Sequence, residues 1–452
     1  MKVIARLQIL LLVAILTASC WSANVDVPIS SAQPAPVAPN PPAPVNLTFP
    51  RTAAYFLDQH NLPSVDELAR YDVVVLDNDW ANRMPRSFFD ELRSRNPRLK
   101  LLAYVNVVDS VHEIGTYDYW ANAYKLWQLD PSTRQSALPD KWLARTAAGV
   151  PVHEWEDRIM TNLTDRSPRI NGQLFVEYAV DWIVNTVWST GIWDGIFLDV
   201  WGDHIWSADS NKWDIDRDGV DETDDEIYGP GGPWARGLAI GEQRLRAALP
   251  DALILANGDR TLEAGRLNGR VFESFADPTV RPDDVSDVHS YVASASGGGM
   301  SWPPTTININ TEREPPGSPA ALRKARFEFG ATLLQDGYWA PMGSDYGKLE
   351  YYDELDGAGL GRGYLGNPLE QAPSMDLLSR RSASGTGSPA DGAFRRDFDN
   401  GIVIVNTSPA RVTIPLERTY TKLKGTQDPA INDGAQVNAV TIGSHDAIVL
   451  LR

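Results

Sequence analysis

Eight short apolar segments, separated by stretches with helical periodicity, constrain the fold of this chain more than any other feature of its sequence. The segments are Ala53–Leu57, Val73–Leu76, Leu101–Val105, Gly195–Leu198, Leu253–Ala256, Arg270–Phe275, Thr305–Ile309 and Gly337–Ala340. Amphipathic helical patterns such as Arg86–Arg95, Pro233–Ala248 and Pro319–Leu334 lie between them. This order predicts an α/β fold, a (β/α)8 barrel of the TIM type over residues 51–380. A doubly wound open sheet has the same local pattern, and the lack of a GxGxxG turn weakens that alternative only slightly.

The C-terminal segment has a different pattern. Turn signals separate short runs that alternate in polarity, and helical periodicity is missing. The expected strands are Gly401–Asn406, Arg411–Pro415, Thr421–Lys424, Val437–Ile442 and Ala447–Leu451. Residues 390–452 are therefore predicted to form a small all-β, sandwich-like accessory domain, which either binds glycan or covers the flank of the barrel.

The first twenty residues have the pattern of an export signal. Lys2 and Arg6 precede the apolar run Ile9–Leu16, which is too short for a permanent membrane span. Small residues then lead to Cys20, the only cysteine of the chain, and this arrangement resembles a bacterial lipoprotein signal. It predicts a signal peptide over residues 1–20 and a cell-envelope protein held to the membrane only by a lipid on Cys20. Thr17 stands where Leu is usual, so ordinary secretion after cleavage nearby is the alternative.

Composition limits the partners. Residues 21–50 are rich in proline and predict a semi-rigid spacer. The net charge of −18 opposes binding to nucleic acid or to an anionic membrane through a basic surface. The 15 Trp favour a carbohydrate ligand, because indole faces stack on sugar rings, although Trp also fills large barrels. A monomer is the expected state.

Two acidic residues near the ends of predicted strands are the candidate catalytic pair. Asp199 ends the apolar run Gly195–Leu198, and Glu273 lies within Arg270–Phe275. Barrel active sites lie where the strands end, and glycoside cleavage needs two carboxyl groups at a fixed separation. Taken singly, each acid could instead pair with an arginine or cap a helix.

These same segments carry a resemblance to a known family. Tyr71–Asp77, Asp194–Asp199 and the Glu273 strand resemble bacterial glycoside hydrolases related to the endo-α-1,4-polygalactosaminidases of glycoside hydrolase family 114. Trp142–Arg145 and Tyr351–Glu354, with the Leu101–Asn106 strand, resemble a less characterised group of hypothetical glycosyl hydrolases, whose accessory domain the β tail also resembles. The likeness covers most of residues 51–365. It implies a retaining mechanism with Asp199 as nucleophile and Glu273 as acid/base. The insertion between Gly202 and Pro233, and extra residues between the two acids, depart from the family pattern and put the substrate in doubt.

Further polar and aromatic residues near strand ends are candidate sugar-binding residues. They are Tyr55, Asp77, Asp79, Asn106, Trp201, Asn257, Asp259, Trp302 and Asn308. Side chains of these types contact sugar hydroxyls or stack on sugar rings, but they equally make ordinary loop turns or fill the core.

The insertion contains the pattern of a calcium loop. Carboxylates occupy positions one, three, five, nine and twelve, glycine is at six, and position seven offers a carbonyl. The predicted ligands are Asp214, Asp216, Asp218, Val220, Glu222 and Asp225. Asp225 replaces the usual Glu, which weakens discrimination against Mg²⁺, and an acidic solvated loop is the alternative. A Ca²⁺ ion here would be structural, and no organic cofactor is expected.

Together these features predict an exported glycoside hydrolase that cleaves an extracellular polysaccharide, with retention, through Asp199 and Glu273. The alternative is a catalytically inactive surface lipoprotein that binds glycans. Metal-dependent amide hydrolysis is disfavoured because the 6 His are scattered without HxH or HExxH spacing, and serine hydrolysis because no GxSxG is present.

Overall fold

A computed structural model describes residues 48–58, 61–111, 138–155, 158–263, 265–276, 284–295, 305–311, 314–342, 347–371, 373–382 and 392–452. The predicted signal peptide with Cys20, most of the predicted spacer and Trp302 lie outside the described residues. Within them, every helix is too short or too polar to cross a membrane.

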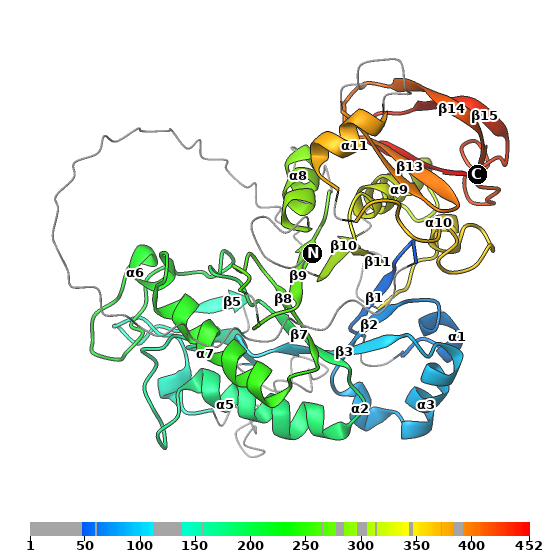
Figure 1. Ribbon diagram of the computed structural model, residues 1–452. Coiled ribbons are helices and arrows are strands. Elements are labelled where there is room, and N and C mark those ends of the chain that lie inside the picture. The colour runs from blue at the N-terminus through cyan, green and yellow to red at the C-terminus, as the bar shows by residue number, and fades with distance from the viewer. Residues whose placement is uncertain are drawn as a thin grey trace, which may run out of the picture. The chain divides into compact units, whose positions relative to one another are not determined.

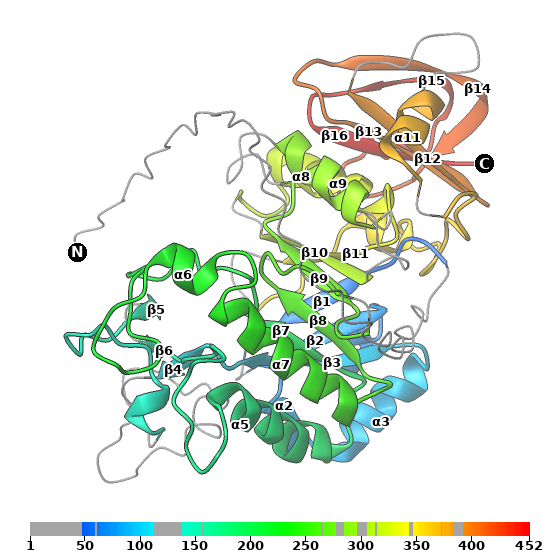
Figure 2. The same ribbon diagram turned by 60° about the vertical axis from the view of Figure 1, so that its left-hand side comes forward.

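The eight predicted apolar segments form one parallel sheet that is nearly closed into a barrel (Figures 1 and 2). In spatial order its strands are β1 (Ala53–Phe56), β2 (Val73–Asp77), β3 (Lys100–Asn106), β7 (Gly195–Asp199), β8 (Leu253–Asn257), β9 (Gly269–Glu273), β10 (Thr305–Thr311) and β11 (Tyr338–Met342). A single parallel bridge between Thr52 and Trp339 joins the first strand to the last. The predicted barrel is confirmed, and the open doubly wound alternative is excluded.

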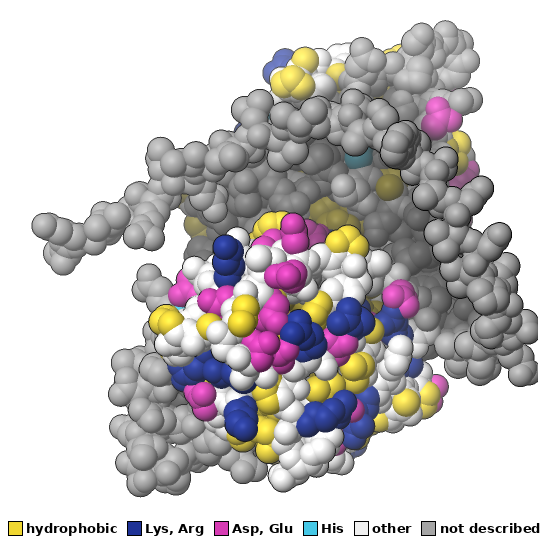
Figure 3. Space-filling model, turned by 90° about the vertical axis from the view of Figure 1, so that its left-hand side faces the viewer, with side chains coloured by type: hydrophobic (Ala, Val, Ile, Leu, Met, Phe, Trp, Pro, Cys, Tyr) yellow, Lys and Arg dark blue, Asp and Glu magenta, His cyan; other side chains and the backbone are white. Residues whose placement is uncertain are grey.

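Most helices of the described residues lie around the barrel, whereas the last one packs on the C-terminal sheet. The helices are α1 (Val65–Leu68), α2 (Trp80–Arg83), α3 (Arg86–Arg95), α5 (Phe175–Trp182), α6 (Asp224–Tyr228), α7 (Pro233–Ala248), α8 (Asp284–Ala295), α9 (Pro319–Leu333), α10 (Asp353–Asp356) and α11 (Met375–Ser382). A π-helical turn, Ile183–Val187, extends α5. Figure 3 faces the side of α5 and α7, where basic side chains lie among acidic ones; Arg244 of α7, for example, pairs with Asp181 of α5 at 2.7 Å.

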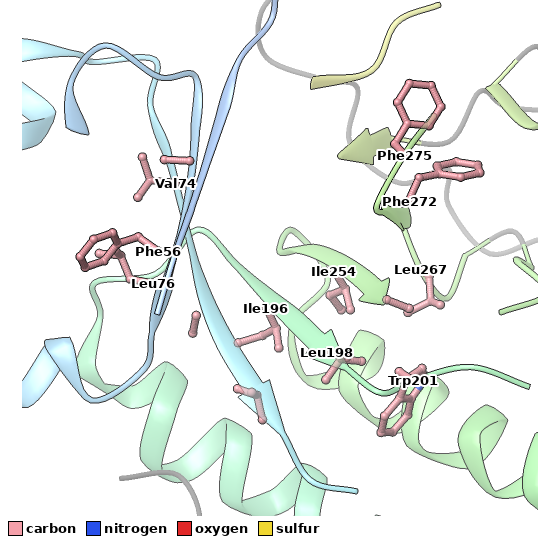
Figure 4. Packing of buried hydrophobic residues seen from close by; sticks show 14 of the residues in the cluster. Phe56, Val74, Leu76, Ile196, Leu198, Trp201, Ile254, Leu267, Phe272 and Phe275 are labelled. Atoms are coloured by element: carbon pink, nitrogen blue, oxygen red, sulfur yellow. The ribbon is translucent and has the colours of Figure 1, made fainter. Parts of the chain in front are cut away.

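Strand alternation divides the core into an inner and an outer layer. On β2, Val73 and Val75 belong to the cluster inside the barrel, whereas Val74 and Leu76 pack outside it with Phe56 of β1 (Figure 4). Successive side chains of a strand point to opposite faces, so every second residue shares the interior.

The same alternation brings polar residues to the carboxyl ends of four adjacent strands. Tyr104, Phe197, Leu255 and Val271 are interior core residues, and the strand-ending residues Asn106, Asp199, Asn257 and Glu273 lie two positions further along the same strands. These four polar side chains therefore lie on the inner side at the barrel mouth, where active sites of such barrels are built.

A small antiparallel sheet next to this mouth was not predicted. It contains β4 (Asp109–Val111), β6 (Arg158–Met160) and β5 (His153–Trp155), in that order. Because β4 begins three residues after β3 ends, this sheet brings Asp109, Glu154 and Arg158 close to the strand-ending residues.

The C-terminal residues form the predicted all-β region as one five-stranded antiparallel sheet. Its order is β12 (Ala393–Phe398), β13 (Gly401–Asn406), β16 (Asp446–Leu451), β14 (Val412–Lys422) and β15 (Gln436–Ile442). The two strands predicted within residues 411–424 are a single strand with an irregularity between Pro415 and Tyr420, and β12 was not predicted.

Helix α9 joins this sheet to the barrel. Arg326 of α9 pairs with Asp446 of β16 at 3.1 Å and with Asp428 at 2.6 Å. At Gly330, a Cβ atom would lie 2.4 Å from Cβ of Ala447, so only glycine allows the helix to approach the sheet this closely. The β sheet therefore covers the flank of the barrel, one of the two roles expected of it.

Candidate active site

A cavity of about 830 Å³ opens at the carboxyl ends of the strands. Asn106, Asp199, Asn257 and Glu273 line it, each at the end of its strand. This volume is in the range of ligand-binding clefts, and the lining combines aromatic rings with many polar and charged groups.

Asn257 holds the two candidate catalytic acids together. Its Nδ2 donates to Asp199 Oδ1 at 2.9 Å and to Glu273 Oε2 at 3.0 Å. Because both oxygens contact one nitrogen, their separation cannot exceed the sum of these distances, about 6 Å. The two carboxylates therefore face one another across a single small volume of the cavity.

Tyr104 fixes the other oxygen of Asp199. Its hydroxyl donates to Asp199 Oδ2 at 2.5 Å. Burial, followed by the charge of Asp199, raises the pKa of Tyr104 well above its usual value, so the hydroxyl keeps its proton and remains a donor. Asp199 thus has both oxygens held, one by Tyr104 and one by Asn257.

The backbone turns sharply directly after each acid. Val200, which follows Asp199, has φ +53°, and Ser274, which follows Glu273, has φ +52°. Positive φ is rare for residues with a side chain, and for β-branched Val it is an outlier of the kind that gathers at functional sites.

The turn after Asn257 requires glycine. Gly258 has φ +123°, and a Cβ atom at this position would lie 2.7 Å from the N and Cα of Gly202. The loops that follow β7 and β8 consequently touch through their backbones, and Trp201 N donates to Asn257 O at 2.7 Å. This contact fixes the ends of the two strands relative to one another.

A second pair of carboxyl groups, Asp109 and Glu154, lines the same cavity. Asn106 Nδ2 donates to Asp109 Oδ2 at 2.9 Å, and Ser207 Oγ donates to Glu154 Oε1 at 2.5 Å. The remaining oxygens, Asp109 Oδ1 and Glu154 Oε2, are buried, and the two carboxyl groups hydrogen-bond to each other, which requires a proton on one of them.

Burial raises the pKa of both of these acids. Burial, followed by the charge of Glu154, raises the pKa of Asp109 well above its ordinary value, and Arg158 opposes this rise only in part. Burial raises the pKa of Glu154 as well, although its hydrogen bonds with Ser207 and Asp109 lower this pKa in part. The negative charge of Asp199 raises the pKa of both acids further. The pair therefore holds a proton at a pH where exposed acids have lost theirs.

The substitution Asp109→Asn is expected to change how the stability of the folded protein depends on pH. The folded wild type keeps protons that the unfolded chain releases above pH about 4, so its stability falls as pH rises from there through the raised pKa. Asn cannot ionise, so we expect the melting temperature of the variant to exceed that of wild type increasingly between pH 4 and 8. Calorimetry across this range measures the difference. Asp90→Asn, at an exposed residue, is the control; a difference that is constant with pH would contradict the prediction.

Most of the chain matches a known protein family. The model of hypothetical glycosyl hydrolase family 15 matches residues 93–402, more than half of the chain. The chain belongs to this family. The resemblance to a group of hypothetical glycosyl hydrolases is thus confirmed, and the matched range contains Asp199, Asn257 and Glu273.

Solved structures with a similar fold come from several glycoside hydrolases. The glycoside hydrolase domain of a PelA variant from Pseudomonas aeruginosa has 16% identity and a TM-score of 0.38, over 65% of this chain and 93% of that one. Amy13B from Eubacterium rectale has 9% identity and a TM-score of 0.46, over 92% and 97%. A GH27 β-L-arabinopyranosidase from Geobacillus stearothermophilus has 10% identity and a TM-score of 0.41, over 90% and 96%. No curated protein matches the chain.

Several predicted sugar-binding residues of this family 15 chain line the cavity. Asn106, Asn257, Tyr55 and Asp259 do so. Tyr55 also packs against Phe197, with ring centroids 5.2 Å apart, and is therefore mostly a barrel core residue. Asp259 accepts from Arg270 at 2.6 Å, which leaves it at the rim.

Three other predicted residues do not line the cavity. Asp77 is buried and its Oδ1 accepts from the backbone of Asp79 at 2.8 Å, while Asp79 pairs with Arg83 at 2.5 Å. These two acids shape the turn after β2. Asn308 is buried between β10 and α9 and donates to Thr332 at 3.0 Å. The structure gives each of the three a structural role.

Trp201 is a core residue and not a sugar-stacking residue, which corrects the sequence-based prediction. It is 1% exposed, and its indole donates to Glu242 of α7 at 3.1 Å. Figure 4 shows it beside Leu198 in the outer layer of the core. The positive φ of Val200 interrupts strand alternation, so Trp201 points outward although Asp199, two residues earlier, points inward.

The sequence analysis missed several residues of the cavity, among them Tyr104, Asp109, Glu154 and Trp206. Tyr104 could have been found, because it lies two residues before Asn106 on an apolar strand and shares its face. Asp109, Glu154 and Trp206 had no such signal, since they lie on the small sheet and the insertion loop.

Part of the predicted calcium loop gathers in space. The carboxylates of Asp214, Asp216 and Asp218 place one oxygen each within 4.8 Å of one another. Gly219 has φ +91°, as the sharp turn at position six requires, and its N–H donates to Asp214 Oδ2 at 2.9 Å. Oxygen donors in this number and spacing suit a hard divalent cation.

The other predicted ligands do not join this group. Glu222 accepts from Ile215 N at 3.0 Å and pairs with Arg166 at 2.8 Å. Arg166 also pairs with Asp216, so one cation already neutralises part of the loop. Val220 and Asp225 are exposed. Of the predicted ligands, only Asp214, Asp216 and Asp218, at loop positions one, three and five, are close enough together to bind one Ca²⁺ ion.

Proposed function

We propose that this family 15 protein hydrolyses the glycosidic bonds of an extracellular polysaccharide with retention of anomeric configuration. The observation that carries the proposal is the shared hydrogen bonding of Asp199 and Glu273 to Asn257 Nδ2. It limits the separation of the two oxygens to about 6 Å, near the roughly 5–5.5 Å of retaining enzymes and below the roughly 6.5–9.5 Å that leave room for a water.

Asp199 suits the role of nucleophile. Tyr104 and Asn257 hold its two oxygens and orient the carboxylate, while Glu273 lies exposed to the cavity and can exchange protons with solvent. In the first step Glu273 protonates the leaving oxygen as Asp199 Oδ attacks the anomeric carbon, which gives a glycosyl ester and frees one product. In the second step Glu273 removes a proton from water, the water attacks the same carbon, and Asp199 leaves as carboxylate.

A reducing-end assay on a panel of exopolysaccharides, including polymers rich in amino sugars, tests this proposal. The amino sugars are chosen because of the resemblance to polygalactosaminidases. Proton NMR of the first product should show the anomer of the substrate; the opposite anomer would exclude retention. Glycan binding without release of any reducing end would favour the inactive glycan-binding lipoprotein.

We also propose export and a lipid anchor on Cys20, supported by the charged, apolar and small-residue order of residues 1–20. The intact mass of the mature protein from a bacterial envelope decides this. A mass with a diacylglycerol-modified cysteine at the N-terminus supports the anchor, and an unmodified N-terminus beyond Cys20 supports secretion instead.

We further propose that the loop of Asp214, Asp216 and Asp218 binds Ca²⁺, which would offset the mutual repulsion of three close carboxylates. Removing Ca²⁺ with EGTA is expected to lower the melting temperature, because an ion that binds only the folded state adds about 2.7 kcal/mol at 100 times its dissociation constant. Activity should fall as well, since Asp224 at the start of α6 contacts His204 of the cavity at 2.7 Å.

Differential scanning calorimetry with EGTA, and again with Ca²⁺ or Mg²⁺ restored, measures this effect. Asp214→Ala is the matched variant and should no longer respond to Ca²⁺. A melting temperature that EGTA and Ca²⁺ both leave unchanged in the wild type would show that the loop is an acidic solvated segment.

A further inference from the structure

Trp206 is the most exposed large apolar side chain among the described residues, at 78%, yet it lines the cavity. It lies in the loop after β7, within the insertion in which this chain departs from the family 114 pattern. Leaving an indole in water forgoes the free energy of burying it, so an exposed Trp beside an active-site cavity points to a ligand.

The contacts of Trp206 hold its ring in place from one side. It stacks on His204 with ring centroids 3.8 Å apart and an interplanar angle of 19°. His204 in turn contacts Asp224 at 2.7 Å and the ring of Tyr228 at 4.4 Å. Since one face of the indole lies on His204 while most of the side chain is exposed, the opposite face is open to a ligand.

Polar groups lie next to this aromatic surface. Ser207, the next residue, donates to Glu154 Oε1 at 2.5 Å, which ties the Trp206 loop to the second carboxyl pair. Asp109 is 4% exposed, and it lines the cavity together with Glu154, to which it hydrogen-bonds. Carboxyl oxygens that line a cavity can accept hydrogen bonds from the hydroxyls of a sugar.

We propose that Trp206, Asp109 and Glu154 form a binding subsite for one pyranose ring of the substrate, next to the bond cleaved at Asp199. The apolar face of the sugar stacks on the open face of Trp206, and hydroxyls on the ring edge donate to Asp109 and Glu154. The inference rests on the proposed function and adds to it a specificity-determining site. A ring with axial groups on both faces fits an indole face poorly, so flat pyranoses are preferred.

The test is binding to the Glu273→Gln variant, which is expected not to consume its ligand. The probes are maltohexaose, cellohexaose, chitohexaose and the hexasaccharide of chitosan, each followed by isothermal titration. Adding Trp206→Ala should raise the dissociation constant of the bound probe by about tenfold or more, whereas Trp206→Phe keeps most of the affinity. Asp109→Asn, which removes one of the two carboxyl groups, should also weaken binding.

Leu360→Ala is the control, because Leu360 is 61% exposed and does not line the cavity. It should leave affinity unchanged, and Trp206→Ala should leave the melting temperature within a few degrees of its parent. Equal affinity of the Trp206→Ala variant and its parent overturns the subsite, as does a lack of binding to every probe. Hydrolysis of the probes by the wild type is measured separately. If the wild type hydrolyses a probe but the Trp206→Ala variant binds it as tightly as its parent does, the subsite is excluded and the proposed activity stands. If binding depends on Trp206 but the wild type hydrolyses no probe, the proposed activity is excluded and the subsite stands.

Discussion

Asp199→Asn and Glu273→Gln are each expected to lower kcat by about a thousandfold or more while leaving the protein folded. Asn at position 199 keeps the shape of Asp and one accepting oxygen, so it still accepts from either Tyr104 or Asn257, but it cannot form the glycosyl ester. Gln at position 273 can still accept from Asn257 but cannot give a proton to the leaving oxygen. Because each substitution keeps the size of the side chain and at least one of its hydrogen bonds, and because the melting temperature of each variant can be checked, a loss of activity with an unchanged melting temperature reports chemistry and not folding.

The two roles can be told apart with azide. In Glu273→Ala, the glycosyl ester of Asp199 would still form with a good leaving group, and azide, which needs no general base, would attack it and restore turnover with a retained glycosyl azide as product. In Asp199→Ala no such retained product is expected. Asp90→Asn, at an exposed residue of α3 that does not line the cavity, is the control and should keep full activity. Near wild-type turnover in either Asp199→Asn or Glu273→Gln would remove that residue from the reaction.

Glu242→Ala is expected to lower the free energy of unfolding by about 3–5 kcal/mol, the usual result of breaking a buried ion pair from one side. Glu242 of α7 is 1% exposed and accepts from Arg260 at 2.6 Å and from the Trp201 indole at 3.1 Å. Arg266 lies 3.4 Å away. The variant would leave two guanidinium groups and an indole N–H buried with fewer acceptors.

This network also supports the active site. Arg260 follows β8 and pairs with Asp203, which follows β7, so Glu242 connects both loops to α7. Urea unfolding at pH 7 measures the stability change, and a raised KM or lowered kcat would accompany it. Glu91→Ala is the matched control, because Glu91 forms an exposed pair with Arg95 at 3.1 Å that is worth about 1 kcal/mol or less. Equal losses in the two variants would contradict the role given to the buried network.

The positions of the barrel strands and of the strand-ending acids could be predicted because both depend on local patterns. A buried strand needs a short apolar run wherever it lies, and the turn that follows it needs small or polar residues. Asp199, Glu273, Asn106 and Asn257 were therefore visible in the sequence.

The side-chain contacts at the mouth of the barrel could not be predicted from the sequence, because they join segments that only the closed barrel brings together. Asn257 lies between Asp199 and Glu273 since β8 lies between β7 and β9, and the small β4–β6–β5 sheet places Glu154 beside Asp109. Neither contact leaves a periodic signal in the sequence.

The two tryptophans after β7, Trp201 and Trp206, also show which features the sequence can predict and which it cannot. Sequence spacing alone favours Trp201 as a ligand contact, because it follows Asp199 by two residues on an alternating strand. The left-handed backbone at Val200 directs Trp201 into the core, and the loop that continues from Gly202 brings Trp206 to the cavity. The sequence by itself determined the eight-stranded barrel, the all-β tail and the acids at the strand ends, because burial periodicity and turn chemistry are local. Only the tertiary structure decided which of these acids share a donor and which indole faces the cavity, because both depend on strand order and on backbone turns that no residue pattern specifies.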